Sequence, residues 1–438
     1  MDEATKASEE KPVGLLKKAM SSIRALIEKG AIDILAGSFL TKIAAFLGSV
    51  ILVRVLAVDD YGYLTFAENR YVYVYLLAGL GLNNAVFRYV VLAKTDEEKH
   101  GVFNFVALWG TVFNLLLVVV AGATFMLLPT TLGFDMGTRL IPILLIALPF
   151  QYLFDTSTFS LRALFKNRMY ALSALLAIVL VWSTKVIGAR TVGLLGTAIA
   201  TPVAYGIMSL VLLLYFYQRV FKGTKAAPVS SAMKKEMVVF SLQYMVTNGL
   251  WALFMQNDLL LLGSLTGDPT AVAYYRVAYV IPSALSILSS SIGLFVVPYF
   301  VKHEKDSRWV WSNYKKVVLI SVSVIGLASL GVILFGASII RFAYGEQYLQ
   351  ALPIMTILLV SSVINNGLRY PTANILSAMG MVKVNMIVSA AGTALQLLLN
   401  WLLIPRYGAY GTAICSVVAY SFMAIVIMTY FAKANRGK

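Results

Sequence analysis

The sequence predicts an all-α polytopic membrane protein with about twelve transmembrane helices in two homologous six-helix halves. Three observations support this fold class: the composition, the recurrence of long apolar runs, and an internal repeat. Of the 438 residues, 59% are hydrophobic and only 13% are charged. A soluble protein carries roughly 45–50% apolar and about 25% charged residues. The composition therefore excludes an ordinary soluble globular protein.

The apolar runs have the length of membrane-spanning helices. A helix rises ~1.5 Å per residue, so about 20 mostly apolar residues cross a ~30 Å hydrocarbon core. Strands of a membrane barrel would be ~10 residues long and would alternate apolar with polar residues, unlike the runs here. We expect helices over 31–57, 61–83, 101–128, 138–161, 168–188, 192–217, 237–264, 270–300, 317–340, 349–370, 382–404 and 408–432.

Residues 1–30 precede the first span. Within them Leu16, Met20, Ile23 and Ile27 recur at helical spacing beside basic residues. This pattern is typical of an amphipathic helix on an anionic membrane surface. The alternative is a disordered, charged leader. A cleavable signal peptide is disfavoured, because its apolar stretch would come earlier and be shorter.

The basic residues predict the orientation of the spans. If the N-terminus is cytoplasmic and the spans alternate, 26 of the 36 basic residues lie in cytoplasmic segments. Lysine and arginine are enriched in cytoplasmic loops, so we expect both termini inside. The same asymmetry explains most of the net charge of +16 without a nucleic-acid partner. The outward-facing turns hold Arg54, Arg139, Lys185, Arg190, Arg341 and Arg406.

An internal repeat relates the two halves of the chain. A shift of 215 residues places Gly193-Leu-Leu-Gly-Thr-Ala-Ile over Gly408-Ala-Tyr-Gly-Thr-Ala-Ile, and 12 of 24 positions from 193 to 216 are identical. Chance matches between apolar helices share Leu and Ile, but not Gly, Thr and Tyr in register. Six spans separate the copies, so the halves have the same orientation and form a pseudo-two-fold repeat. This design is typical of transporters whose substrate site lies between the halves.

The spans and the repeat predict five segments. These are a cytoplasmic N-terminal segment at 1–30, an N-terminal half at 31–217, a basic cytoplasmic linker at 218–236, a C-terminal half at 237–432 and a cytoplasmic tail at 433–438. The single cysteine, Cys415, excludes an internal disulfide and a Cys-based metal cluster. The sequence contains no Gly-rich phosphate loop, no Ser/His/Asp set and no metal-ligand spacing. We therefore expect no enzyme activity and no cofactor.

Seven ionisable side chains are predicted inside the spans, where a charge costs several kcal/mol unless it faces a cavity or a partner. Four are basic and are candidate substrate contacts in a cavity: Lys42, Arg70, Arg276 and Arg369. Three are acidic and are candidate ion-coupling residues: Glu68, Asp155 and Asp258. An excess of basic over acidic groups favours an anionic ligand.

Several of these residues have structural alternatives. Asp258 and Arg276 lie at matching depth on consecutive spans, so the two side chains can neutralise each other. Arg369 can snorkel to the inner surface. Lys42 lies about 11 residues into the first span with no acid within one turn. A lone lysine suits a phosphate or carboxylate, because a point charge needs no fixed geometry. Intramembrane amides such as Gln396 are expected to join helices.

The first spans carry a pattern found in known transporters. It runs from Gly37-Ser-Phe-Leu-Thr-Lys-Ile-Ala-Ala-Phe through Arg54-Val-Leu-Ala-Val-Asp-Asp-Tyr-Gly to Gly79-Leu-Gly-Leu-Asn-Asn-Ala-Val-Phe-Arg-Tyr. This pattern resembles Wzx-type polysaccharide flippases of the multidrug/oligosaccharidyl-lipid/polysaccharide (MOP) exporter superfamily, over nearly the whole chain. Lipid II flippases of that superfamily generally have fourteen spans, which disfavours that branch.

The resemblance implies a transporter that flips a polyprenyl-pyrophosphate-linked oligosaccharide, a polysaccharide, O-antigen or capsule repeat unit, from the cytoplasmic to the outer leaflet. It implies alternating access driven by an H⁺ or Na⁺ gradient, in the cytoplasmic membrane of a bacterium or archaeon. Its implied partners are membrane lipids, a glycan polymerase and glycosyltransferases. The alternatives are a cation-coupled exporter of small amphipathic drugs and a non-transporting scaffold of a polysaccharide assembly complex.

Overall fold

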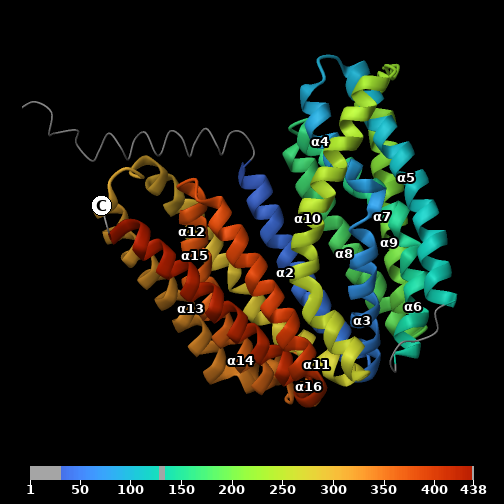
Figure 1. Cartoon of the computed structure of the whole chain (residues 1–438). Coiled ribbons are helices and arrows are strands. Elements are labelled where there is room, and N and C mark those ends of the chain that lie inside the picture. The colour runs from blue at the N-terminus through green and yellow to red at the C-terminus, as the bar shows by residue number, and fades with distance from the viewer. Residues whose placement is uncertain (1–30, 128–133, 437–438) are drawn as a thin grey trace, which may run out of the picture.

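The computed structural model describes residues 31–127 and 134–436, and its regular elements there are all helical. Figure 1 shows two helical lobes that meet at one end of the molecule and diverge toward the other. The amphipathic helix expected within residues 1–30 lies outside the described residues. The predicted all-α fold class is confirmed.

The N-terminal lobe contains the helices from α2 to η2. They are α2 (Ala31–Val55), α3 (Val58–Tyr75), η1 (Ala78–Gly81), α4 (Leu82–Leu92), α5 (Asp96–Leu127), α6 (Asp135–Leu145), α7 (Ala147–Ala163), α8 (Asn167–Thr191), α9 (Leu194–Tyr215) and η2 (Phe216–Val220). Helix α2 packs along α8, and α8 packs antiparallel to α9.

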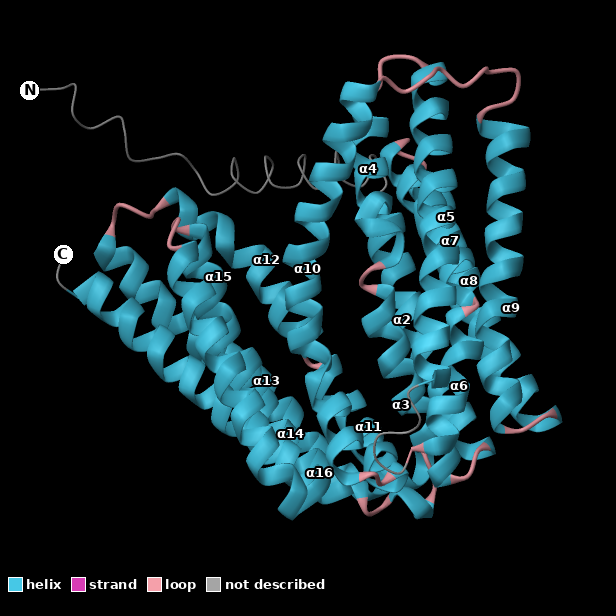
Figure 2. Ribbon diagram, turned by 45° about the vertical axis from the view of Figure 1, so that its right-hand side comes forward, coloured by secondary structure: helices cyan, strands magenta, loops and turns pink. Residues whose placement is uncertain are grey.

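Helix α10 (Ser231–Thr266) follows and contacts both lobes, packing on α4 and η1 as well as on α11 and α16. The C-terminal lobe contains α11 (Pro269–Ala284), α12 (Ser286–Lys302), α13 (Ser307–Ala343), η3 (Glu346–Tyr348), α14 (Ala351–Ser362), η4 (Val363–Arg369), α15 (Tyr370–Ala378) and α16 (Val382–Arg436). Figure 2 shows how α13 to α16 lean away from the N-terminal lobe.

Eight described helices are long and apolar enough to cross a membrane, and ten segments are if each bent pair counts as one span. The bent pairs, α3 with α4 and α6 with α7, each turn by 49°. Helix α16 is 55 residues long, but its backbone is non-helical at Gly408, so it contains two segments. Dividing α16 there and adding the 36-residue α10 gives twelve segments, the number that the sequence predicts.

The break between α3 and α4 depends on glycine and on a buried amide. Gly79, Leu80 and Gly81 all have positive φ, a conformation in which the helical hydrogen bonds cannot continue. The freed N–H of Gly79 donates to Asn114 Oδ1 on α5 at 3.0 Å. A buried backbone group needs such a partner, since hydrocarbon supplies none.

The backbone repeats the sequence duplication. Gly193 (φ 73°, ψ −142°) and Gly408 (φ 53°, ψ −131°), which the repeat aligns, share a conformation open essentially to glycine alone. One turn later, Gly196 packs against the carbonyl oxygen of Gly188, and the aligned Gly411 packs against that of Leu403. The two hairpins, α8–α9 and the two segments of α16, therefore have the same geometry.

The lobes are joined at one end by close contacts. Arg54 Nε donates to the carbonyl oxygen of Ala343 at 2.9 Å, and its guanidinium also donates to Phe342. A cation at the C-terminus of α13 is favoured by the helix dipole and by the orphan carbonyls. A Cβ on Gly62 would lie 1.9 Å from the Pro269 carbonyl oxygen, so only glycine permits this approach of α3 to α11.

Tyrosines fill the interior of this closed end. The ring of Tyr348 makes edge contacts with Tyr61 and Tyr274, with centroids 6.5 and 6.0 Å away. These residues belong to, or pack against, a buried apolar cluster that includes side chains from both lobes. The end opposite the divergence is therefore sealed by apolar and aromatic packing.

We expect Gly408→Ala to lower the free energy of unfolding by about 1–3 kcal/mol, because a Cβ is strained at this φ and ψ. Gly326→Ala is the matched control. Gly326 lies within α13, and a Cβ added there would have no atom of a neighbouring element within 4 Å. This substitution should raise stability by up to about 1 kcal/mol. Thermal unfolding of both variants in detergent measures the difference. Equal stability of the two variants would contradict the backbone repeat.

Candidate functional site

A central cavity of about 500 Å³ lies between the lobes. Its walls come from α2, α3 and α8 of the N-terminal lobe and from α11 and α12 of the C-terminal lobe. Three of the seven predicted site residues line it, namely Lys42, Glu68 and Arg276. Residues far apart in the sequence thus meet at the interface where the repeat predicts a substrate site.

The α2 wall of the cavity combines one cation with an apolar surface. Lys42 lies on the cavity face with Phe39, Ile43 and Phe46, which are all exposed apolar side chains. Residues three and four apart share one face of a helix, so Lys42 is surrounded by apolar groups. Arg276, across the cavity on α11, lies beside the Tyr61 hydroxyl.

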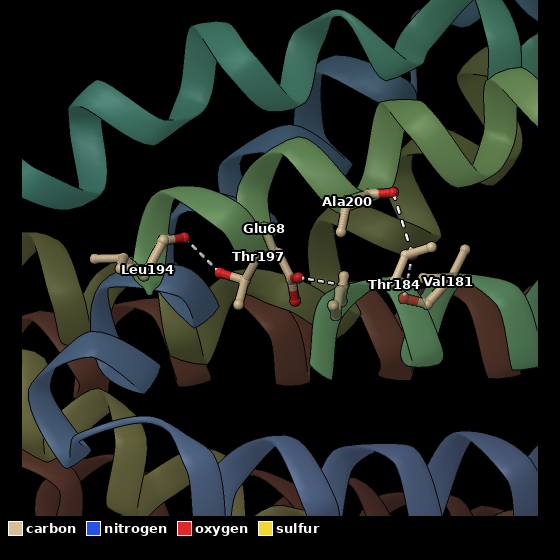
Figure 3. A network of polar contacts seen from close by, with 7 residues as sticks. Glu68, Val181, Thr184, Leu194, Thr197 and Ala200 are labelled. Atoms are coloured by element: carbon tan, nitrogen blue, oxygen red, sulfur yellow. Dashed lines mark hydrogen bonds and ion pairs between the residues drawn. The ribbon is translucent and has the colours of Figure 1, made fainter. Parts of the chain in front are cut away.

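Glu68 forms a partly buried ion pair. Its Oε1 accepts from Lys185 Nζ on α8 at 2.5 Å. The Lys185 side chain is 8% exposed and the Glu68 side chain 32% exposed. Figure 3 shows the Glu68 carboxylate beside α8 and α9, next to the hydrogen bonds of Thr184 and Thr197. Glu68 is therefore not a free acid in this conformation.

Trp182, on the same helix as Lys185, makes a cation–π contact with it. Lys185 Nζ lies 5.1 Å from the centre of the Trp182 ring, and Trp182 also lines the cavity. A Cβ on Gly48 of α2 would lie 2.3 Å from the Trp182 ring. The glycine thus provides the space that lets α2 pack against this tryptophan.

A smaller cavity of about 230 Å³ lies within the C-terminal lobe and is lined mainly by hydroxyl and amide groups. Asp258 of α10 is the one carboxylate in its lining. It accepts hydrogen bonds from four neutral donors at 2.8–3.2 Å: Tyr275, Gln396, Asn400 and Ser416. Across 31–127 and 134–436, no group of three His, Cys, Asp or Glu side chains could hold a metal ion.

The two cavities are neighbours. Tyr279, Ser283 and Ser286 line both of them. The Tyr279 ring stacks on Tyr275, with centroids 6.3 Å apart, and Tyr275 bonds Asp258. A change at Asp258 can therefore reach the central cavity through one layer of side chains.

Asp155 lies in a separate cluster of the N-terminal lobe. Its carboxylate accepts from the Tyr75 hydroxyl, and Tyr71, which stacks on Tyr75, donates to Gln151 at 2.7 Å. Tyr71 and Tyr75 thus join α3 to α7. Neither of the two cavities described above includes Asp155 in its lining.

The alternative in which Asp258 and Arg276 neutralise each other does not match the structure. Among the described residues no ion pair joins them, because Asp258 points to α16 whereas Arg276 points to the central cavity. Consecutive spans at equal depth need not present their side chains to each other. Depth can be counted from sequence, but the rotation of a helix depends on its packing.

Arg70 and Arg369 lie outside the central cavity. The guanidinium of Arg70 sits 4.5 Å from the centre of the Phe66 ring and donates to Ser264 of α10 at 3.0 Å. Arg369 is only 6% exposed and donates to Asn365 and Ser389 at 3.2 and 2.9 Å. Arg369 therefore does not snorkel; it supports Asn365, which lines the C-terminal cavity.

Lys185 is the site residue that sequence reasoning missed. The sequence places it in an outward-facing turn, whereas the structure places it inside α8, six residues before the helix ends at Thr191. A usable signal was present, because the repeat shift of 215 aligns position 185 with Asn400, one of the intramembrane amides.

Comparison with known proteins agrees with the sequence pattern. A family model described as polysaccharide biosynthesis protein matches residues 27–304, more than half of the chain. The uncharacterized membrane protein MJ1068 of Methanocaldococcus jannaschii is 27% identical over 243 residues, which cover 52% of this chain and 46% of that protein. The alignment thus spans about half the length of this curated relative.

Solved structures of MOP superfamily transporters share the fold. An inward-facing MATE family multidrug resistance transporter has a TM-score of 0.70 at 15% identity, covering 90% of this chain and 95% of its own. The lipid II flippase MurJ, in an inward closed conformation, has the same TM-score and identity, covering 91% and 87%. An outward-facing MATE transporter has a TM-score of 0.55 at 14% identity, covering 94% and 95%. The predicted resemblance to this superfamily is confirmed.

We expect Tyr275→Phe to lower the free energy of unfolding by about 1.5–3 kcal/mol, since it removes a hydrogen bond to a buried carboxylate. Tyr275 is 1% exposed, so its hydroxyl bonds the carboxylate inside the protein rather than at its surface. Tyr299→Phe is the matched control, because Tyr299 is 50% exposed, and it should change stability by less than about 0.5 kcal/mol. Chemical or thermal unfolding in detergent distinguishes them; similar losses in both would argue against the Asp258 network.

Proposed function

The chain belongs to the polysaccharide biosynthesis protein family, and from this premise we propose that it flips a polyprenyl-pyrophosphate-linked oligosaccharide from the cytoplasmic to the outer leaflet. The observation that carries the proposal is the central cavity, where two cations stand beside an exposed apolar wall. An amphiphile with an anionic head and a lipid tail is complementary to such a cavity: the head can bind the cations and the tail can lie along the apolar wall.

The charges of the cavity suit a pyrophosphate. Lys42 and Arg276 line it from opposite lobes, and the carboxylate of Glu68 is paired with Lys185. Arginine binds phosphate oxygens through two parallel N–H donors, whereas lysine acts as a point charge. A ligand phosphate contacted from both sides would draw the two lobes together, which couples binding to lobe movement.

The apolar wall suits the lipid portion. Phe39, Ile43 and Phe46 expose their side chains on the cavity face of α2. Ala284 and Ile287 face them from α11 and α12. A prenyl chain can lie along such a surface while the sugar and pyrophosphate remain in the polar part of the cavity. A drug cation would instead favour an acidic cavity, which disfavours the exporter alternative.

The conformation fits the cytoplasm-facing state of an alternating-access cycle. The connections α4–α5, η2–α10 and α12–α13 lie at the end where the lobes diverge (Figure 1) and include Lys94, Lys222 and Lys305. By the positive-inside rule this end is cytoplasmic. The similarity to inward-facing MATE, with a TM-score of 0.70 against 0.55 for the outward-facing form, supports this assignment.

The C-terminal cavity suits the coupling ion. Asp258 is held there by neutral donors, so it can take up H⁺ or Na⁺ without displacing a fixed counter-ion. Hydroxyl and carbonyl oxygens around one carboxylate are ligands that a hard cation such as Na⁺ accepts. The wall shared with the central cavity provides the link from ion binding to substrate binding. Of the three acidic candidates, we therefore favour Asp258.

Lys42→Ala and Arg276→Ala should each reduce flipping at least about tenfold, since each removes a charge-assisted contact worth roughly 1.5–3 kcal/mol. The measurement is protein-dependent movement of a labelled polyprenyl-pyrophosphate oligosaccharide in proteoliposomes. Lys383→Ala is the matched control, because Lys383 is exposed near the start of α16. Wild-type rates in Lys42→Ala, with folded protein, would reject its assignment.

Asp258→Asn should abolish the response of flipping to the coupling gradient while substrate binding persists. The amide cannot take up a proton and carries no charge to attract Na⁺. Flipping rates with and without pH and Na⁺ gradients, compared with Asp155→Asn, measure this. A response that is lost only in Asp155→Asn would move the coupling site to the N-terminal lobe.

A further inference from the structure

The ion pair between Glu68 and Lys185 is an unusual way to join two membrane helices. Removing two charges from water costs several kcal/mol per ion, and apolar pairs of similar volume often serve packing equally well. This pair also lies at the wall of the central cavity rather than in the middle of a lobe. Packing alone therefore does not account for it.

The internal repeat identifies what stands at the corresponding place in the other lobe. The register that aligns Gly193 with Gly408 continues through the hairpin, because the Gly188–Gly196 contact recurs between Leu403 and Gly411. Eight residues before each aligned glycine stand Lys185 and Asn400. Lys185 and Asn400 thus occupy structurally equivalent positions of the repeat.

Both positions donate a hydrogen bond to a carboxylate on a neighbouring helix. Asn400 Nδ2 donates to Asp258 Oδ1 at 2.8 Å, and Lys185 Nζ donates to Glu68 Oε1 at 2.5 Å. One donor is neutral and the other is a cation. The C-terminal carboxylate therefore keeps its negative charge available, whereas the N-terminal one is neutralised by a group that cannot leave.

We propose that Lys185 is a specificity-determining residue: a tethered cation that neutralises Glu68, denies that carboxylate to mobile cations and leaves the two cations of the central cavity, Lys42 and Arg276, unopposed. The inference rests on the proposed function in that it concerns the charge of the ligand. With Lys185 present, Lys42 and Arg276 act on a ligand without opposition from Glu68. Without Lys185, the partly exposed Glu68 carboxylate would face the ligand as a bare acid.

The surroundings of Lys185 keep it in this role. Its side chain is nearly buried, whereas that of Glu68 is one-third exposed to the cavity. The ammonium is also held near the face of the Trp182 ring at 5.1 Å, and cation–π contacts strengthen when water is excluded. The lysine thus acts from behind the wall, and the ligand meets only the neutralised carboxylate.

The test measures the charge preference of the purified full-length chain with two probes, inorganic pyrophosphate and the lipophilic cation tetraphenylphosphonium. Lys185→Met should weaken pyrophosphate binding at least about tenfold and tighten binding of the cation. The unpaired Glu68 carboxylate then repels the anion and attracts the cation, and one unit charge near a binding site changes an affinity by about this factor. The double variant Glu68→Gln/Lys185→Met should restore both affinities toward wild type, since the net lining charge is restored. Lys383→Met is the control and should change neither affinity.

A purely structural role predicts a different pattern. In that case the double variant would resemble Lys185→Met, and the preference for anion over cation would not change; either result overturns the proposal. If the wild type fails to bind pyrophosphate, the proposed function is contradicted, but the cation probe still tests Lys185. Should Lys185→Met fold poorly, Lys185→Arg, which should bind as the wild type does, and the double variant, which buries no unpaired charge, complete the comparison.

Discussion

Hydrocarbon solvates neither a charge nor an unbonded peptide group, and the arrangement of this protein follows from that constraint. Charged groups and freed backbone groups inside the spans are therefore stable where the chain supplies a partner. The amide of Gly79, freed where the helix breaks, is met by Asn114. The guanidinium of Arg54 meets the carbonyls that end α13. The carboxylates of Glu68 and Asp258 each receive a donor from an equivalent place in the repeat.

The repeat gives each lobe a hairpin of the same geometry but with a different charge. Both hairpins turn at a glycine with the same backbone conformation, and within each hairpin the two helical segments approach closely at a second glycine. Within that common frame, a lysine in one lobe and an asparagine in the other decide whether a carboxylate is neutralised permanently or left to an exchangeable ion. In the proposed function, this asymmetry assigns the anionic ligand to one cavity and the coupling cation to the other.

The contacts that seal one end of the molecule are of a kind that can separate. Apolar and aromatic packing around Tyr348 and a few hydrogen bonds to backbone carbonyls join the lobes there. Among the described residues no ion pair links α3 to α11 at this end. A seal without a buried cross-lobe ion pair can open without leaving a buried charge unpaired, as the alternating access that we propose requires.

The sequence by itself determined the class of protein and its all-helical membrane fold, indicated the internal repeat, and included among its seven charged candidates three that line the central cavity, Lys42, Glu68 and Arg276. These follow from length, hydropathy and the scarcity of charge in apolar runs, which are local properties. The tertiary structure decided which of the charged groups meet. It separated Asp258 from Arg276, placed Arg70 and Arg369 outside the lining of the central cavity, and brought Lys185 to Glu68. Depth in the membrane can be counted along a chain, but the face that a helix presents is set by its neighbours, because small rotations exchange one partner for another.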